Sequence, residues 1–80
     1  MKIQVLETRQ NALSEIKKLL DEAYERIVSA RKLAELHNLG SIQFRTAKVE
    51  HKISLLTGAS ENLTKKYQRE VAFLEKKNAD

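Results

Sequence analysis

The stretch Asn38-Leu39-Gly40-Ser41 interrupts a sequence that otherwise holds almost nothing to break a helix. The 80 residues include no proline and two glycines, Gly40 and Gly58, and much of the remainder is Leu, Ala, Glu, Lys and Ile. Glycine tolerates the left-handed conformation that ends a helix, and a serine after it can cap the next one. We therefore expect Gly40 to end one helix and Ser41 to begin another.

The segment before this turn, residues 2–38, repeats its apolar side chains every seven residues. Two rows form the predicted contact stripe: Leu6, Leu13, Leu20, Ile27 and Ala34, with Arg9, Ile16, Ala23, Ala30 and His37 beside them. Such a spacing, held for about four heptads, is typical of a left-handed coiled coil. It predicts a first arm over residues 2–38 that packs along its length against another helix.

The segment after the turn, residues 42–77, predicts a second arm with a similar stripe. Its members are Ile42, Thr46, Val49, Ile53, Leu56, Ser60, Leu63, Tyr67, Val71 and Leu74. The steps alternate between four and three residues until Tyr67, after which an extra step of four makes a stutter. Gly58 could break the arm and leave a third helix from about Ser60 onward. Because the spacing continues through Gly58, we favour one arm that is kinked there.

A connection as short as residues 39–41 forces neighbouring helices to run antiparallel. Folding the arms about it places Ile16 opposite Leu63 and Ala23 opposite Leu56, so stripe meets stripe. The sequence thus predicts an all-α fold with one domain over residues 1–80, a long, coiled-coil-like antiparallel helical hairpin.

The two stripes use only part of the apolar residues. Further candidates for an interaction face are Leu19, Leu33, Phe44, Ala47, His51 and Leu55. Exposed apolar surface of this extent usually marks a binding surface, and a small domain without cysteine needs regular packing or oligomerisation for stability. We expect dimerisation into a four-helix bundle, although a different helical protein would satisfy the same requirement.

The chain is mildly basic, with 15 basic and 11 acidic residues and a net charge of +4. The cations of the second arm that flank Phe44 or continue beyond it form a candidate anion or nucleic-acid face: Arg45, Lys48, Lys52, Lys66 and Arg69. Basic side chains beside an aromatic ring can hold a phosphate backbone. The same charges also fit the solvated rim of a protein interface, and we favour this interpretation.

No arrangement of residues indicates catalysis, a cofactor or a metal. The sequence has no cysteine nucleophile, no phosphate-binding glycine loop and no His-Glu-x-x-His motif. Its histidines, His37 and His51, are expected about 13 Å apart along the hairpin, too far to share a metal. No apolar run approaches the roughly 20 residues of a membrane span, and no signal peptide is recognisable, so we expect a cytoplasmic protein.

These observations favour a non-enzymatic helical protein–protein interaction module. Its partner would be a second copy, a specific protein, or both. Small adaptors, regulators and assembly chaperones, including those of phages and mobile elements, fit this description. The alternative is a nucleic-acid-binding helical hairpin dimer that uses the basic second arm.

Overall fold

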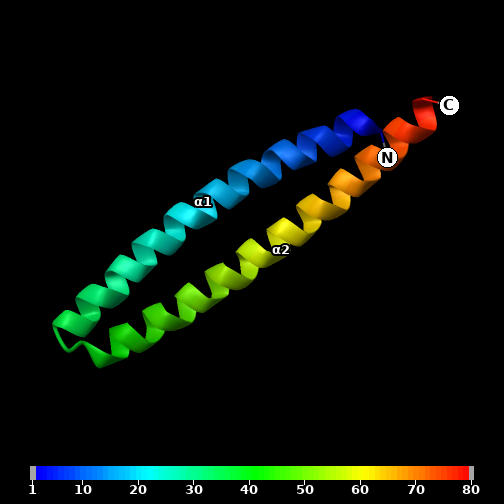
Figure 1. The fold of residues 1–80 in the computed structure, drawn as a ribbon. Coiled ribbons are helices and arrows are strands. Elements are labelled where there is room, and N and C mark those ends of the chain that lie inside the picture. Colours follow the sequence, from blue (N-terminus) through cyan, green and yellow to red (C-terminus); the bar gives the residue numbers. More distant parts are fainter. Residues whose placement is uncertain (1, 80) are drawn as a thin grey trace.

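The computed structural model describes residues 2–79 and contains two long helices. Helix α1 spans Ile3–Leu36 and helix α2 spans Gly40–Ala79, and residues 37–39 join them. The helices lie side by side and run in opposite directions (Figure 1). The predicted all-α hairpin is confirmed, and the described part of the chain contains no strand.

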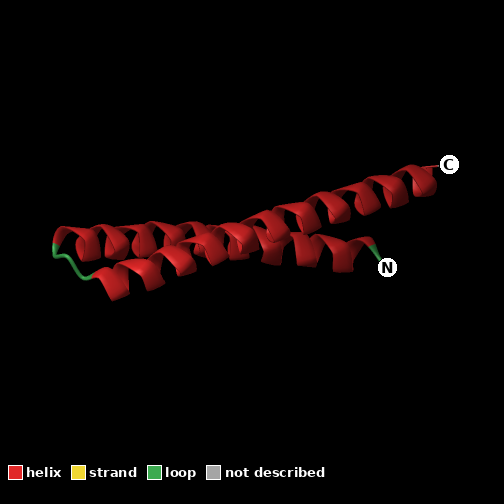
Figure 2. Cartoon of the chain, turned by 90° about the horizontal axis from the view of Figure 1, so that it is seen from below, coloured by secondary structure: helices red, strands yellow, loops and turns green. Residues whose placement is uncertain are grey.

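The molecule is a rod measuring 64 × 15 × 13 Å. Its radius of gyration is 18.2 Å, whereas a compact domain of this length would have about 12 Å. Both termini lie at the end opposite the turn, and α2 extends beyond the start of α1 (Figure 1). Viewed after a 90° rotation, the helices cross each other (Figure 2). Within residues 2–79, each helix can therefore be covered only by the other helix.

The turn is built on Asn38, whose φ of 56° is left-handed. The Asn38 N–H donates to the Glu35 carbonyl (3.2 Å) and the Leu39 N–H donates to the Ala34 carbonyl (2.9 Å). This pair of hydrogen bonds is a Schellman motif, which satisfies carbonyls at the end of a helix. Asparagine is the residue that best tolerates this conformation after glycine.

The expected role of Gly40 is therefore wrong. Neither glycine has a positive φ, because the chain has already reversed at Asn38 and α2 begins at Gly40. The Leu39 carbonyl accepts the first bond of α2, from the Gln43 N–H at 2.9 Å. Ser41 lies inside the first turn of α2 and is not its cap.

Helix α2 continues without interruption through Gly58. This confirms a single second arm and excludes a separate third helix beginning near Ser60. Outside the adjoining backbone of α2, a methyl group at Gly58 would meet no heavy atom within 4 Å.

The surface where the helices meet, here called the seam, contains one predicted row from each helix. These core rows are Leu6, Leu13, Leu20, Ile27 and Ala34 of α1 and Thr46, Ile53, Ser60, Tyr67 and Leu74 of α2. Leu6, Leu13 and Ala34 are buried, and the other core-row residues are partly buried. The core rows hold the apolar contacts of the hairpin.

The second row on each side of the seam differs from the prediction. The polar rows, which lie beside the core rows, are Ile3, Gln10, Lys17, Tyr24 and Arg31 of α1 and Gln43, Glu50, Thr57, Thr64 and Val71 of α2. The predicted residues are displaced to the side of the seam: Ile16 is 44% exposed and Leu56 is 55% exposed. The core and polar rows of α2 together follow alternating spacings of three and four residues along the helix. The seam therefore contains no stutter after Tyr67.

The threonine hydroxyl groups in the seam donate to carbonyls of their own helix. Thr46 Oγ1 donates to the Ile42 carbonyl (2.9 Å), and Thr57 and Thr64 donate likewise to the carbonyls four residues earlier. Each hydroxyl therefore needs no partner from α1, and the methyl group remains for packing. This is how a seam rich in threonine can lie against leucine.

The turn predicts different effects of alanine at two neighbouring positions. Asn38→Ala should lower the free energy of unfolding by about 1 kcal/mol, because the left-handed conformation is strained for alanine. Gly40→Ala should raise it by about 0.5 to 1 kcal/mol, because a methyl at Gly40 meets nothing and alanine is the better helix former. Urea denaturation followed by circular dichroism measures both values.

Asn38→Gly is the matched control and should be at least as stable as the wild type. If Gly40→Ala were the more damaging alanine substitution, the assignment of the turn to Asn38 would be incorrect.

Candidate functional site

The hairpin has two long edges of different character. Both helices are right-handed and run in opposite directions, so corresponding rows fall on the same side of the seam. The polar rows of α1 and α2 share one side, which we call the polar edge. Next to the core rows on the other side lie the edge rows: Arg9, Ile16, Ala23, Ala30 and His37 of α1 and Ile42, Val49, Leu56, Leu63 and Glu70 of α2.

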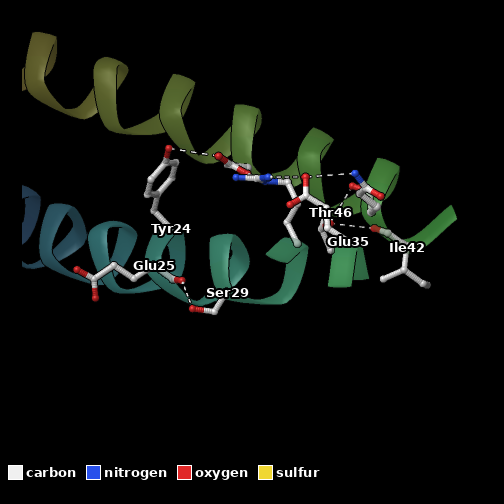
Figure 3. A network of polar contacts seen from close by, with 9 residues as sticks. Tyr24, Glu25, Ser29, Glu35, Ile42 and Thr46 are labelled. Carbon is white, nitrogen blue, oxygen red and sulfur yellow. Dashed lines mark hydrogen bonds and ion pairs between the residues drawn. The ribbon is translucent and has the colours of Figure 1, made fainter. Parts of the chain in front are cut away.

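Hydrogen bonds join the helices along the polar edge near the turn (Figure 3). Arg31 Nε donates to Glu50 Oε2 at 2.6 Å, and the Tyr24 hydroxyl donates to Glu50 Oε1 at 3.4 Å. Glu35 Oε1 accepts from Arg31 Nη1 and from Gln43 Nε2, each at 3.2 Å. Two carboxylates thus bind one guanidinium and tie both helices together.

The side chains of Arg31 and Glu50 are 25% and 19% exposed. The hydrogen bond to Glu50, followed by the charge of Glu50, raises the pKa of Arg31. A raised pKa means that the stabilisation is fully present at neutral pH and is lost only under strongly alkaline conditions.

A separate ion pair joins Lys17 to Glu61 at 3.5 Å. Both side chains are about half exposed, so this pair contributes little to stability.

An open groove of about 670 Å³ lies over the polar network. Its walls include Phe44, Ala47 and His51 as well as the ion-paired residues. Four polar side chains of its lining, Arg31, Glu35, Gln43 and Glu50, are already hydrogen-bonded to one another.

Large aliphatic side chains accumulate on the opposite side. We define the apolar edge by its exposed members: Val5, Ile16, Leu19 and Leu33 of α1 and Ile42, Val49, Leu56 and Leu63 of α2. They occupy the edge rows and the outer row of α1, which comprises Val5, Ala12, Leu19, Arg26 and Leu33. The other large exposed apolar side chains lie elsewhere: Tyr24, Leu36, Leu39, Phe44, Leu55 and Phe73.

The apolar surface of α1 is centred on the apolar edge and not on α2. Its core, edge and outer rows are adjacent on the helix and all three are mainly apolar, so the middle of the stripe is the edge row. The edge row points past α2 to the side of the hairpin. Helix α2 therefore covers the core-row flank of this apolar stripe, and the large side chains of the edge and outer rows of α1 remain exposed.

The total accessible surface agrees with this geometry. It is 6358 Å², whereas a compact monomer of 9.2 kDa would expose about 4,900 Å². The difference is of the size that one partner buries in a large protein interface.

The structure does not gather the six residues of the predicted interaction face on one surface. Leu19 and Leu33 lie on the apolar edge, and Phe44, Ala47 and His51 line the groove at the polar edge. Leu55 lies on the far side of α2, one helical position away from the exposed Leu56. Sequence reasoning missed the edge row of α2 as a binding surface because it assigned those residues to the seam.

The five predicted basic residues do form one surface. Arg45, Lys52 and Lys66 belong to the outer row of α2, beside the apolar edge, and Lys48 and Arg69 belong to the adjoining back row. All five are exposed, and none has an ion-pair partner in the described part of the chain. The ammonium group of Lys48 lies 4.4 Å from the centroid of the Phe44 ring, a cation–π contact.

Between residues 2 and 79, no group of three or more His, Cys, Asp or Glu side chains could hold a metal ion. Over the same range, neither helix combines the length and apolar character needed to cross a membrane.

Comparison with protein-family models, with curated proteins and with solved structures found no match to this chain.

The polar edge predicts unequal effects of two charge reversals. Glu50→Lys places a cation against Arg31 and removes the acceptor of Tyr24, so it should lower the Tm by several degrees. Glu61→Lys reverses a charge at the half-exposed pair and should leave the Tm nearly unchanged. Thermal denaturation at one fixed protein concentration compares them. Equal losses would mean that the Arg31 network has no special role.

Proposed function

We propose that the chain is a non-enzymatic helical interaction module that binds a helical partner through its apolar edge. The single observation behind the proposal is that the apolar stripe of α1 is centred on this edge, beyond the reach of α2. The simplest partner is a second copy, which would complete a four-helix bundle and turn the polar edges outward. Small adaptors, regulators and assembly chaperones are the classes of protein that work in this way.

The shape of the apolar edge suits the packing of another helix against it. Ala12, Ala23 and Ala30 alternate with larger residues such as Ile16 and Leu19 along α1. Small residues leave hollows into which side chains of an opposing helix can insert. In the assembled bundle we expect a left-handed supercoil and a kink of α2 near Gly58, where no side chain bridges neighbouring turns.

Two adjacent leucines provide a matched test of this surface. Leu56, on the apolar edge, is 55% exposed, and Leu55, on the back of α2, is 61% exposed. Leu56→Glu should convert an associated wild type into a helical monomer, because a carboxylate would be buried in the interface. Leu55→Glu should leave association unchanged. Sedimentation velocity over a concentration series, with circular dichroism on the same samples, measures both.

A folded wild-type monomer at every concentration would contradict self-association. Equal sensitivity of association to the two substitutions would show that the apolar edge is not the binding surface.

A second candidate function, nucleic-acid binding, is favoured by one observation. The outer and back rows of α2 contain no carboxylate: they are Arg45, Lys52, Ala59, Lys66 and Phe73, then Lys48, Leu55, Asn62, Arg69 and Lys76. Cations without competing carboxylates can neutralise phosphates and release counterions.

This candidate is tested on the back row, which leaves the apolar edge intact. Lys48→Glu with Arg69→Glu should abolish a salt-sensitive affinity for generic RNA or DNA, measured by fluorescence anisotropy. Lys18→Glu with Lys32→Glu, on the exposed side of α1, is the control of equal charge change. No binding at low salt would exclude this function.

A further inference from the structure

The basic side chains of the outer and back rows of α2 repeat along the helix. Arg45 and Lys48 form one pair, which we call the turn pair, and Lys66 and Arg69 form a second, which we call the distal pair. Each pair joins an outer-row residue to a back-row residue three positions later, and all four side chains are exposed. The distal pair follows the turn pair by 21 residues, which is about 32 Å along the helix axis.

The cations of this face are concentrated at the two levels of the pairs. Lys52 lies next to the turn pair, and Lys65 and Lys76 lie near the distal pair. Between them the two rows hold only uncharged side chains: Leu55, Ala59 and Asn62. Neither row contains a carboxylate over residues 45–76. The back of α2 therefore presents two positive patches separated by a neutral segment.

Both pairs can reach one straight ligand. In a straight α-helix, 21 residues stop about 60° short of six full turns, so each pair points about 30° to one side of a common direction. Lysine and arginine carry their charges on long, flexible stems that can make up this difference. The two patches therefore act on the same side of the rod.

The distance between the pairs fits the repeat of double-stranded DNA. A straight rod that lies along a duplex meets the same strand once in every helical turn, about 34 Å. The duplex stays straight over this distance, because its persistence length is about 50 nm. Each pair can then contact phosphates of one strand, one turn apart, while the neutral segment spans the grooves between these contacts.

Other nucleic acids fit this face less well. Proteins bind single strands in grooves whose aromatic rings stack on the bases. The back of α2 is instead a convex helix surface, and the ring of Phe44 already has the ammonium group of Lys48 at 4.4 Å. Double-stranded RNA is recognised largely through its 2′-hydroxyls, and Asn62 is the one uncharged polar side chain of these two rows between the pairs.

We propose that the back of α2 binds double-stranded DNA, with the turn pair and the distal pair on phosphates of one strand that lie one helical turn apart. This inference rests on the second candidate function, nucleic-acid binding, and names its ligand. Because the contacts are to phosphates and not to base edges, binding does not depend on the base sequence.

The length of the DNA tests the two-point contact. At 3.4 Å per base pair, a 16-bp duplex of about 54 Å reaches both pairs, whereas a 6-bp hairpin stem of about 20 Å reaches one. Fluorescence anisotropy over a salt series should give a plot of log K against log salt that is about twice as steep for the duplex as for the stem. Equal slopes would overturn the inference.

Exchanging residues within rows tests the spacing at constant composition. The variant with Ala59→Lys, Asn62→Arg, Lys66→Ala and Arg69→Asn moves the distal pair by one heptad and shortens the spacing to about 21 Å. It should bind the 16-bp duplex about tenfold more weakly than the wild type and a 32-nucleotide single strand equally well. Circular dichroism and sedimentation velocity confirm that helicity and association are unchanged. An unchanged affinity for the duplex would contradict the role of the spacing.

The choice of nucleic acid separates this inference from the function on which it rests. The wild type should bind the 16-bp DNA duplex about tenfold more tightly than the 32-nucleotide single strand, which has a similar number of phosphates. Equal affinity for the two, or tighter binding to a 16-bp RNA duplex, would retain nucleic-acid binding and refute this ligand. No binding to any of these at low salt would refute the second candidate function itself.

Discussion

The left-handed conformation of Asn38 determines which residues of the two helices lie level with each other. Because the connection is only residues 37–39, neither helix can slide against the other without breaking the Schellman hydrogen bonds. The register fixed there places Arg31 beside Glu50 and Arg9 beside Tyr67, whose ring centroid lies 6.0 Å from the guanidinium carbon. Every contact along the rod follows from this one turn.

A two-helix seam leaves this particular chain with an excess of apolar surface on one side. Thr46 and Ser60 in the core row of α2 make the seam only moderately apolar, whereas Leu56 and Leu63 stand outside it. The hairpin thus has a polar edge whose side chains hydrogen-bond to one another and an apolar edge whose large side chains remain exposed. This asymmetry underlies the proposed interaction module.

The length and antiparallel pairing of the helices could be predicted because helix breakers are absent outside a few positions and the heptad spacing is regular. The rotation of each helix could not be predicted. Helix α1 carries three adjacent apolar rows, and periodicity alone does not say which two face α2; ion pairing at Arg31 and Glu50 favours the solution seen here. For the same reason the predicted interaction face combines Phe44 and His51 with leucines that lie on the other side of the hairpin. At the turn, Asn38 and Gly40 both tolerate a positive φ, and the sequence does not rank them.

The single connection also implies an order of folding. Bonding Arg31 to Glu50 closes a loop across 19 positions, whereas joining Arg9 to Tyr67 closes one across 58. From an unfolded chain the longer loop costs about 1 kcal/mol more in entropy. The hairpin is therefore expected to zip from the turn toward its free ends. During synthesis α1 would emerge with its leucines exposed and stay unprotected until much of α2 had been made. A cell that produces this chain would need either rapid zipping or an early partner for that first arm.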